Sequence, residues 1–208
     1  MRTPFLDVCR PGVRALARLY FGLRLEGTEH IPQLGPLVIA PNHQTYVDPV
    51  LVTIPIRRRI HYMAWNRLFE IPRLCWAIRR LRAFPVQLES RDPRATREAV
   101  LLLQAGEALM IFPEGARSLD GRIGRFKLGA FRLAVSLGVP VLPVTIAGGH
   151  ASWHPGRPLP RPASMTVTYD PLVYPDAGAD AREAARQLAE RTRAAITGGA
   201  PAPDSPRP

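Results

Sequence analysis

The sequence contains no uninterrupted apolar stretch of about eighteen residues, the length that a helix needs to cross a bilayer. It therefore predicts no transmembrane span, and the N-terminus lacks the apolar core of a secretory signal. Lysine is nearly missing, because Lys127 is the only one, and arginine supplies almost all of the excess of 28 basic over 17 acidic residues. A net charge of +11 favours an anionic partner, either nucleic acid or a membrane surface.

Residues that would support other chemistries are also scarce. No Gly-x-Ser-x-Gly motif is present, and the two cysteines, Cys9 and Cys75, have no histidine near them in the sequence, so we interpret them as small buried apolar residues. His150 and His154 have no neighbouring Cys, Glu or Asp, and no metal site is predicted. No known nucleic-acid-binding module is present, and the basic residues are spread along the chain, so nucleic acid is not expected as a partner.

The most informative stretch is Asn42-His43-Gln44-Thr45-Tyr46-Val47-Asp48, which follows an apolar run at 37–40. Histidine accepts and returns protons near neutral pH, and a carboxylate can orient it. On a continuous helix the two side chains would lie roughly 140° apart, so contact requires a turn. Asp48-Pro49 supplies one if Asp48 is the N-cap of a helix. By itself the stretch is equally compatible with a cap and an unrelated loop histidine.

A second polar motif, Phe112-Pro113-Glu114-Gly115-Ala116-Arg117-Ser118, also follows a strand-like run, at 108–112. Ligands of open α/β sheets bind beyond the carboxyl ends of the strands, so the two loops can converge on one site. There Glu114 can accept hydrogen bonds from a polyol and Arg117 can bind phosphate through its planar fork. The alternative is a surface turn in which Glu114 and Arg117 pair with each other.

In this order the two motifs, Asn-His-x4-Asp and Phe-Pro-Glu-Gly-x-Arg-Ser, resemble those of the glycerolipid acyltransferases, including the 1-acyl-glycerol-3-phosphate acyltransferases. The resemblance runs from about Gly27 to the apolar stretch at 139–146. It implies that His43 takes the proton of an acceptor hydroxyl, which attacks an acyl thioester directly, while Asp48 holds the imidazole. Asn42, Glu114, Gly115 and Arg117 would bind the acceptor. The resemblance implies no cofactor, since acyl-CoA or acyl carrier protein is the co-substrate.

Two departures concern substrate binding. Ala116 stands where many members have threonine or serine, which removes a hydroxyl that could bond the acceptor. The arginine expected soon after Pro85-Val86 is absent, and either Arg91 or Arg82 can fill that role. Lys127 lies where members often carry a lysine, as a contact for phosphate or thioester or simply as a solvated charge. The acceptor is therefore expected to be lysophosphatidate or a related molecule, such as another lysophospholipid, glycerol 3-phosphate or an amino-acid lipid.

Apolar runs alternate with helical periodicity, which predicts an α/β fold in a single domain. The resemblance adds a central mixed sheet flanked by helices. Strands are expected at 37–40, 60–64, 83–87, 108–112, 139–146 and 165–169, and helices at 49–54, 66–81, 93–103, 126–137 and 179–196, with a loop at 148–154. The acyltransferase domain would span 27–197. The tail at 198–208, rich in Gly, Ala and Pro, is expected to be disordered.

The N-terminal segment, residues 1–26, combines apolar residues with arginine between Val8 and Leu25. It predicts a basic amphipathic helix that lies on an anionic membrane surface or packs on the domain. A second arginine-rich stretch, 65–82, can face lipid, substrate phosphate or solvent. The expected location is the cytoplasmic face of the membrane, as a peripheral protein.

Overall fold

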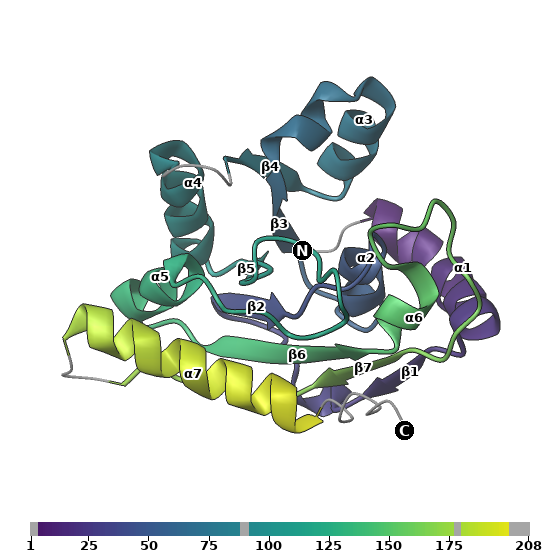
Figure 1. Cartoon of the computed structure of the whole chain (residues 1–208). Coiled ribbons are helices and arrows are strands. Elements are labelled where there is room, and N and C mark those ends of the chain that lie inside the picture. Colours follow the sequence, from purple (N-terminus) through teal and green to yellow (C-terminus); the bar gives the residue numbers. More distant parts are fainter. Residues whose placement is uncertain (1–3, 88–91, 177–179, 200–208) are drawn as a thin grey trace.

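One seven-stranded sheet organises the protein, with the strand order β1-β7-β6-β2-β5-β3-β4. The computed structural model describes residues 4–87, 92–176 and 180–199. All neighbouring strands are parallel except β6 and β7, which are antiparallel. The strands are β1 (Arg24–Glu26), β2 (Leu37–Pro41), β3 (Ile60–Trp65), β4 (Ala83–Val86), β5 (Ala108–Met110), β6 (Val141–Ala147) and β7 (Thr166–Tyr169). The predicted mixed sheet flanked by helices is therefore confirmed (Figure 1).

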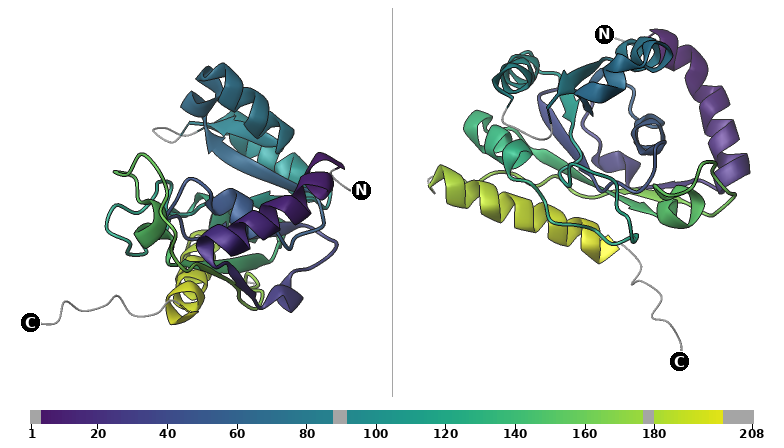
Figure 2. Two further views of the ribbon diagram at one scale, coloured as in Figure 1. Left: turned by 90° about the vertical axis from the view of Figure 1, so that its right-hand side faces the viewer. Right: turned by 45° about the horizontal axis from the view of Figure 1, so that its top comes forward.

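Helices connect the strands and cover the sheet (Figures 1 and 2). The α-helices are α1 (Pro4–Phe21), α2 (Asp48–Thr53), α3 (Pro72–Arg80), α4 (Pro93–Gln104), α5 (Gly129–Leu137), α6 (Gly149–Trp153) and α7 (Ala181–Gly199). Two short 3₁₀ helices are η1 (Thr28–His30) and η2 (Asn66–Glu70). Among the residues described, no helix is both long and apolar enough to cross a membrane.

Strand β2 lies in the middle of the sheet and is buried on both faces, as its continuous apolar sequence requires. Successive side chains of a strand point to opposite faces, and here they join two different cores. Leu37 and Ile39 pack in the core that contains residues of α1 and α2, whereas Val38 and Ala40 pack in the core formed with α4, α5 and α7. This double burial fixes the end of β2, where the first polar motif begins.

Several local predictions were wrong. The helix expected at 66–81 is divided into η2 and α3, because Ile71 is extended (φ −91°, ψ 108°) before Pro72, a conformation that proline favours in its predecessor. The helix expected at 126–137 begins only at Gly129, and the loop expected at 148–154 contains α6. Strand β1 was not predicted, because three residues with two charges show no apolar pattern.

The structure places elements on both sides of the predicted domain boundaries. β1 belongs to the sheet, so the predicted N-terminal segment 1–26 overlaps the domain that was expected to begin at 27. At the other end α7 continues through Gly199, into the predicted tail, and residues 200–208 lie outside the described residues.

Helix α1 divides its apolar residues between the domain and the solvent. Ala17 and Phe21 are buried in the core, whereas Leu16 and Leu19 are 66% and 87% exposed. Packing on the domain and an exposed apolar strip therefore coexist on one helix.

The cysteines also differ from expectation: Cys9 is exposed and Cys75 only half-buried, because both lie on helices whose outer faces are uncovered.

Candidate active site

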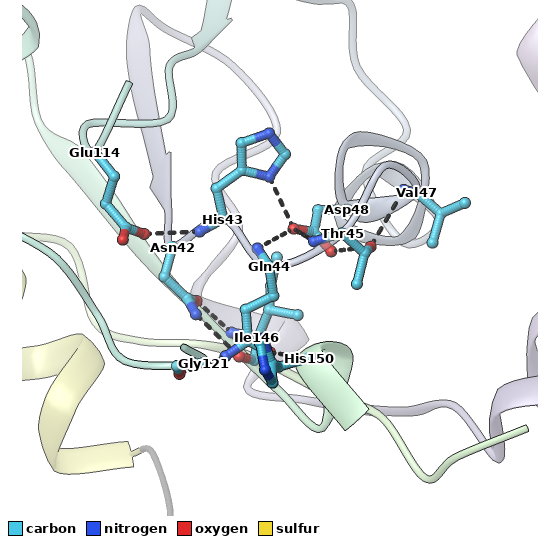
Figure 3. A network of polar contacts seen from close by, with 10 residues as sticks. All are labelled: Asn42, His43, Gln44, Thr45, Val47, Asp48, Glu114, Gly121, Ile146 and His150. Carbon is cyan, nitrogen blue, oxygen red and sulfur yellow. Dashed lines mark hydrogen bonds and ion pairs between the residues drawn. The ribbon is translucent and has the colours of Figure 1, made fainter. Parts of the chain in front are cut away.

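The chain turns sharply between the end of β2 and the start of α2, and this turn brings His43 and Asp48 together. His43 Nδ1 lies 2.9 Å from Asp48 Oδ2 (Figure 3). The Asp48 side chain is fully buried, while 18% of the His43 side chain is exposed. The imidazole thus sits between a buried carboxylate and the solvent, in the arrangement expected of a general base with an orienting acid.

Asp48 organises the whole turn. Its Oδ2 accepts the backbone N–H groups of Gln44 and Thr45 at 2.6 and 2.7 Å, and its Oδ1 accepts the Thr45 hydroxyl at 2.5 Å. Asp48 is the first residue of α2 and Val47 occupies the N-cap, so the predicted N-cap at Asp48 is displaced by one residue. The carboxylate holds the loop before the helix instead, and this loop positions the imidazole.

The two sequence motifs meet at His43. Its backbone N–H donates to Glu114 Oε1 at 2.8 Å, and its carbonyl accepts the Ser118 N–H at 2.8 Å. The imidazole stacks on Phe112, with ring centroids 4.0 Å apart. The second motif therefore fixes the main chain and the ring plane of His43, while Asp48 of the first motif fixes the ring nitrogen Nδ1.

Glu114 connects two loops through backbone amides. One carboxylate oxygen accepts the His43 N–H, and the other accepts the Gly124 N–H at 2.8 Å. Burial is the largest influence on the Glu114 pKa and raises it above the usual value, against the two amide hydrogen bonds that lower it. Each oxygen keeps a lone pair for a substrate hydroxyl, so these contacts add a positioning role to the predicted acceptor-binding role.

The two roles of Glu114 predict different kinetics. If Glu114 mainly positions His43, Glu114→Gln should lower kcat about tenfold with little change in the acceptor KM, because the amide can accept only one of the two backbone N–H groups and leaves the other unpaired. If Glu114 mainly binds the acceptor, KM should rise instead. Steady-state kinetics with varied acceptor distinguish the two, and Glu183→Gln on the exposed face of α7 is the matched control.

Arg117 lies beside the histidine turn rather than paired with Glu114. Its guanidinium carbon lies 3.5 Å from the centroid of the Tyr46 ring, a residue of the same turn. Arg117 Nη1 is buried and has no hydrogen-bond partner among the residues that the structure describes. A buried donor without a partner is costly, so this guanidinium is suited to binding an anionic group of a ligand.

The remaining predicted residues have distinct places. Asn42 is buried, and its side chain exchanges two hydrogen bonds with the Ile146 backbone of β6, at 2.7 and 3.0 Å. Gly115 has a φ of +74°, and the Lys127 side chain packs over it so closely that a Cβ there would lie 2.7 Å from Lys127 Nζ. Lys127 thus points back to the second motif, although it lies in the loop before α5. Arg91 lies outside the described residues.

Arg82 is the one of the two alternatives for the arginine expected near Pro85-Val86 that lies within the described residues. It has a φ of +64° two residues after the end of α3, and its Nε is buried without a hydrogen-bond partner in the described structure. Within the part of the chain that the structure describes, no hydrogen bond or ring contact links it to His43. Its role in substrate binding therefore stays a prediction.

Some contributors were not predicted from the sequence. Gln44 links its own turn to a loop and to α6, because its amide nitrogen donates to the Gly121 carbonyl and its amide oxygen accepts the His150 N–H. Thr45, Tyr46 and Phe112 hold the carboxylate, the guanidinium and the imidazole. All but Gly121 and His150 lie within or at the edge of the two motifs, so their positions in the sequence carried a signal although their contacts did not.

Two further histidines, His150 and His154, lie at the edge of this region. The rings of His150 and His154 lie 5.3 Å apart. Within residues 4–87, 92–176 and 180–199, no cluster of three or more His, Cys, Asp or Glu side chains that could hold a metal ion is present. The groups of the two motifs that can contact a substrate are the His43 imidazole, the Arg117 guanidinium and the Glu114 carboxylate.

Comparison with known proteins agrees with this fold. The sequence profile of the Acyltransferase family matches residues 22–147, which include both motifs and the strands that carry them, and the chain belongs to this family. The crystal structure of the 1-acyl-sn-glycerophosphate (LPA) acyltransferase PlsC from Thermotoga maritima superimposes with a TM-score of 0.76 at 30% identity. The match covers 93% of this chain and 78% of that one.

Curated relatives share the same name for their activity. The chain is 34% identical over 134 residues to the chloroplastic 1-acyl-sn-glycerol-3-phosphate acyltransferase LPAT1 of Arabidopsis thaliana, covering 62% of this chain and 37% of that protein. It is 29% identical to the Bacillus subtilis 1-acyl-sn-glycerol-3-phosphate acyltransferase, covering 67% of this chain and 70% of that protein. The chain thus spans well under half the length of the plant relative.

Proposed function

We propose that the protein is an O-acyltransferase that moves a fatty acyl group from an acyl thioester to the free hydroxyl of 1-acyl-glycerol 3-phosphate, which gives phosphatidate. The observation that carries the proposal is the hydrogen bond between His43 Nδ1 and the buried Asp48, joined to Arg117 through Tyr46. In this proposal His43 is the base, and the Arg117 guanidinium beside the same turn binds the anionic group. The names of the relatives support the choice of acceptor.

The reaction follows from the contacts of the imidazole. Because Nδ1 is engaged with Asp48, Nε2 is the nitrogen that accepts the proton of the acceptor hydroxyl. The acceptor oxygen attacks the thioester carbonyl, forming a C–O bond and a tetrahedral oxyanion. When the C–S bond breaks, the thiolate leaves and takes the proton from the imidazolium. No bond between protein and acyl group is required, since binding both substrates in place supplies much of the acceleration.

The acceptor's phosphate is assigned to Arg117 in this proposal. Arg117→Gln should lower kcat/KM for lysophosphatidate by about 10- to 100-fold, because it removes a charged donor for the phosphate. Monoacylglycerol, which has no phosphate, should be a poor substrate of the unaltered protein and should respond little to the substitution. Thiol release from acyl-CoA, with separation of the lipid products, measures both.

Other results would change the assignment. If monoacylglycerol and lysophosphatidate react equally well, the phosphate has no dedicated site. If glycerol 3-phosphate or another lysophospholipid reacts best, the reaction class stands and the acceptor changes. Acyl carrier protein in place of CoA tests the donor in the same assay. Arg132→Gln, at an exposed position of α5, is the matched control for loss of one arginine.

The proposal places this reaction at an anionic membrane surface, on its cytoplasmic face, with the protein bound peripherally. Leu16 and Leu19 of α1 are exposed and are accompanied by the exposed Arg14 and Arg18. An apolar strip flanked by arginine can lie at the boundary between headgroups and acyl chains, next to an acceptor lipid held in the bilayer.

A further inference from the structure

A second surface, separate from α1, stands out because it is left uncovered by the rest of the protein. Residues 66–80, comprising η2 and α3, form what we call the α3 projection, the uppermost element in Figure 1. Neither helix contains a buried residue, although their sequence is rich in large apolar side chains. No residue of the projection belongs to either hydrophobic core of the described structure. Ile71 and Trp76 are 54% and 58% exposed.

The charge of the α3 projection is strongly one-sided. It carries four arginines and a single acid, Glu70. Within the described part of the chain, none of these arginines forms an ion pair with a carboxylate. The arginines are Arg67, Arg73, Arg79 and Arg80. An uncompensated positive field of this kind attracts an anionic surface.

The arginines are combined with aromatic rings rather than with acids. Arg80 lies over Trp76, Arg79 over Phe69 and Arg67 over Trp65, with guanidinium-to-centroid distances of 4.7, 5.6 and 5.3 Å. Stacking leaves the edge of a guanidinium, with its donors, available to an oxyanion. Tryptophan beside arginine is the composition typical of the interface between lipid headgroups and acyl chains.

An open groove lies on the outer side of α3. Pro72, Arg73, Trp76 and Ala77 line it, and its volume is about 530 Å³. Three of these four residues offer apolar surface and the fourth offers a guanidinium. The groove therefore suits an amphiphile that presents a hydrocarbon segment next to a negative group.

Topology places this surface at the catalytic edge of the sheet. β2, β5 and β3 are parallel, so their carboxyl ends lie along one edge. The His43 turn follows the carboxyl end of β2, and the α3 projection follows the carboxyl end of β3. A surface that docks through the α3 projection therefore approaches the edge at which the candidate active site is found.

We propose that the α3 projection docks onto an anionic lipid bilayer, with Trp76 and Ile71 in the interfacial layer and Arg73 and Arg80 on lipid phosphates. The proposal deepens the proposed function, since it identifies the surface that would bring the catalytic edge to membrane-borne substrates. Nucleic acid is disfavoured as the occupant because Ile71, Pro72 and Ala77 offer no group that pairs with phosphates or stacks on bases.

Vesicle binding tests the proposal without turnover. The full chain is mixed with vesicles of phosphatidylcholine, with and without phosphatidylglycerol, and bound protein is measured by flotation. Arg73→Gln/Arg80→Gln should weaken binding to the anionic vesicles by about thirty-fold, since each arginine near an anionic surface contributes about a factor of five. Arg97→Gln/Arg132→Gln, which removes the same charge from exposed positions of α4 and α5, should have little effect.

The contribution of the apolar side chains of the α3 projection is tested separately. Trp76→Ala should weaken binding, whereas Leu101→Ala on α4 should not, although Leu101 is also 58% exposed. Tryptophan emission should shift to the blue with anionic vesicles in the unaltered protein and shift much less in Trp76→Phe. Circular dichroism confirms that each variant is folded.

The outcomes separate this proposal from the proposed function. Equal binding by the two double variants overturns the proposal, as does preferential binding of duplex DNA that vesicles cannot displace. Turnover of a short-chain, water-soluble lysophosphatidate without vesicles tests the reaction alone, and the α3 variants should retain it. If this turnover is absent while the vesicle results hold, the reaction is wrong and the docking surface stands.

Discussion

Replacing His43 with alanine is expected to lower kcat by about 10²- to 10⁴-fold, the contribution typical of a positioned general base. The physical reason is that the acceptor hydroxyl loses the group that takes its proton while its oxygen attacks. KM values should change little, because the substitution leaves Arg117 and Tyr46 in place. Single-turnover measurements of acyl transfer with saturating substrates report the chemical step.

The control for this experiment is His61→Asn, which removes another partly buried histidine, on β3. It should retain nearly full activity if it is folded. Activity of His43→Ala close to that of the unaltered protein would show that His43 is not the base.

Replacing Asp48 with alanine is expected to lower both stability and activity. The buried carboxylate accepts hydrogen bonds from the Gln44 and Thr45 amides, the Thr45 hydroxyl and the His43 ring. Removing it leaves these buried donors unpaired, which should cost about 3–5 kcal/mol in the free energy of unfolding. Chemical denaturation measures this loss, and kcat should fall with it.

Asp48→Asn separates charge from geometry. The amide oxygen can accept the two backbone N–H groups and the ring N–H, while the amide nitrogen can donate to the Thr45 hydroxyl. Stability should therefore fall much less than in Asp48→Ala. We expect kcat to fall about 10- to 100-fold all the same, because a neutral amide stabilises the imidazolium less than a carboxylate does. Full activity in Asp48→Asn would show that the charge is not used.

The sequence predicted the parts of the fold and the site that depend on local patterns. Apolar runs are visible in a sequence, so the strands other than β1 were found, and Asp48-Pro49 revealed the turn that allows His43 to reach Asp48. β1 was missed because its three residues, two of which are charged, form no apolar run. The break at Ile71 was missed because the apolar pattern continues through it while the proline acts on the backbone alone.

The contacts that hold the site depend on how distant loops meet, and the sequence does not specify this. Glu114 was predicted to face a substrate, but both of its oxygens also bind backbone amides that lie 71 and 10 residues away. A carboxylate can accept from any donor brought near it, so its residue type alone could not identify its partner. The same applies to Gln44, whose partners belong to another loop and to α6.

The side chain of Asn42 helps to determine where the chain leaves the sheet before the His43 turn. Its amide donates to the Ile146 carbonyl and accepts the Ile146 N–H, so it imitates one further residue of β2 opposite β6. The Asn42 side chain thus continues the pairing of β2 with β6, and the main chain can turn away from the sheet just before His43. Removing this amide would alter the direction in which the chain departs, and the position of His43 would change with it.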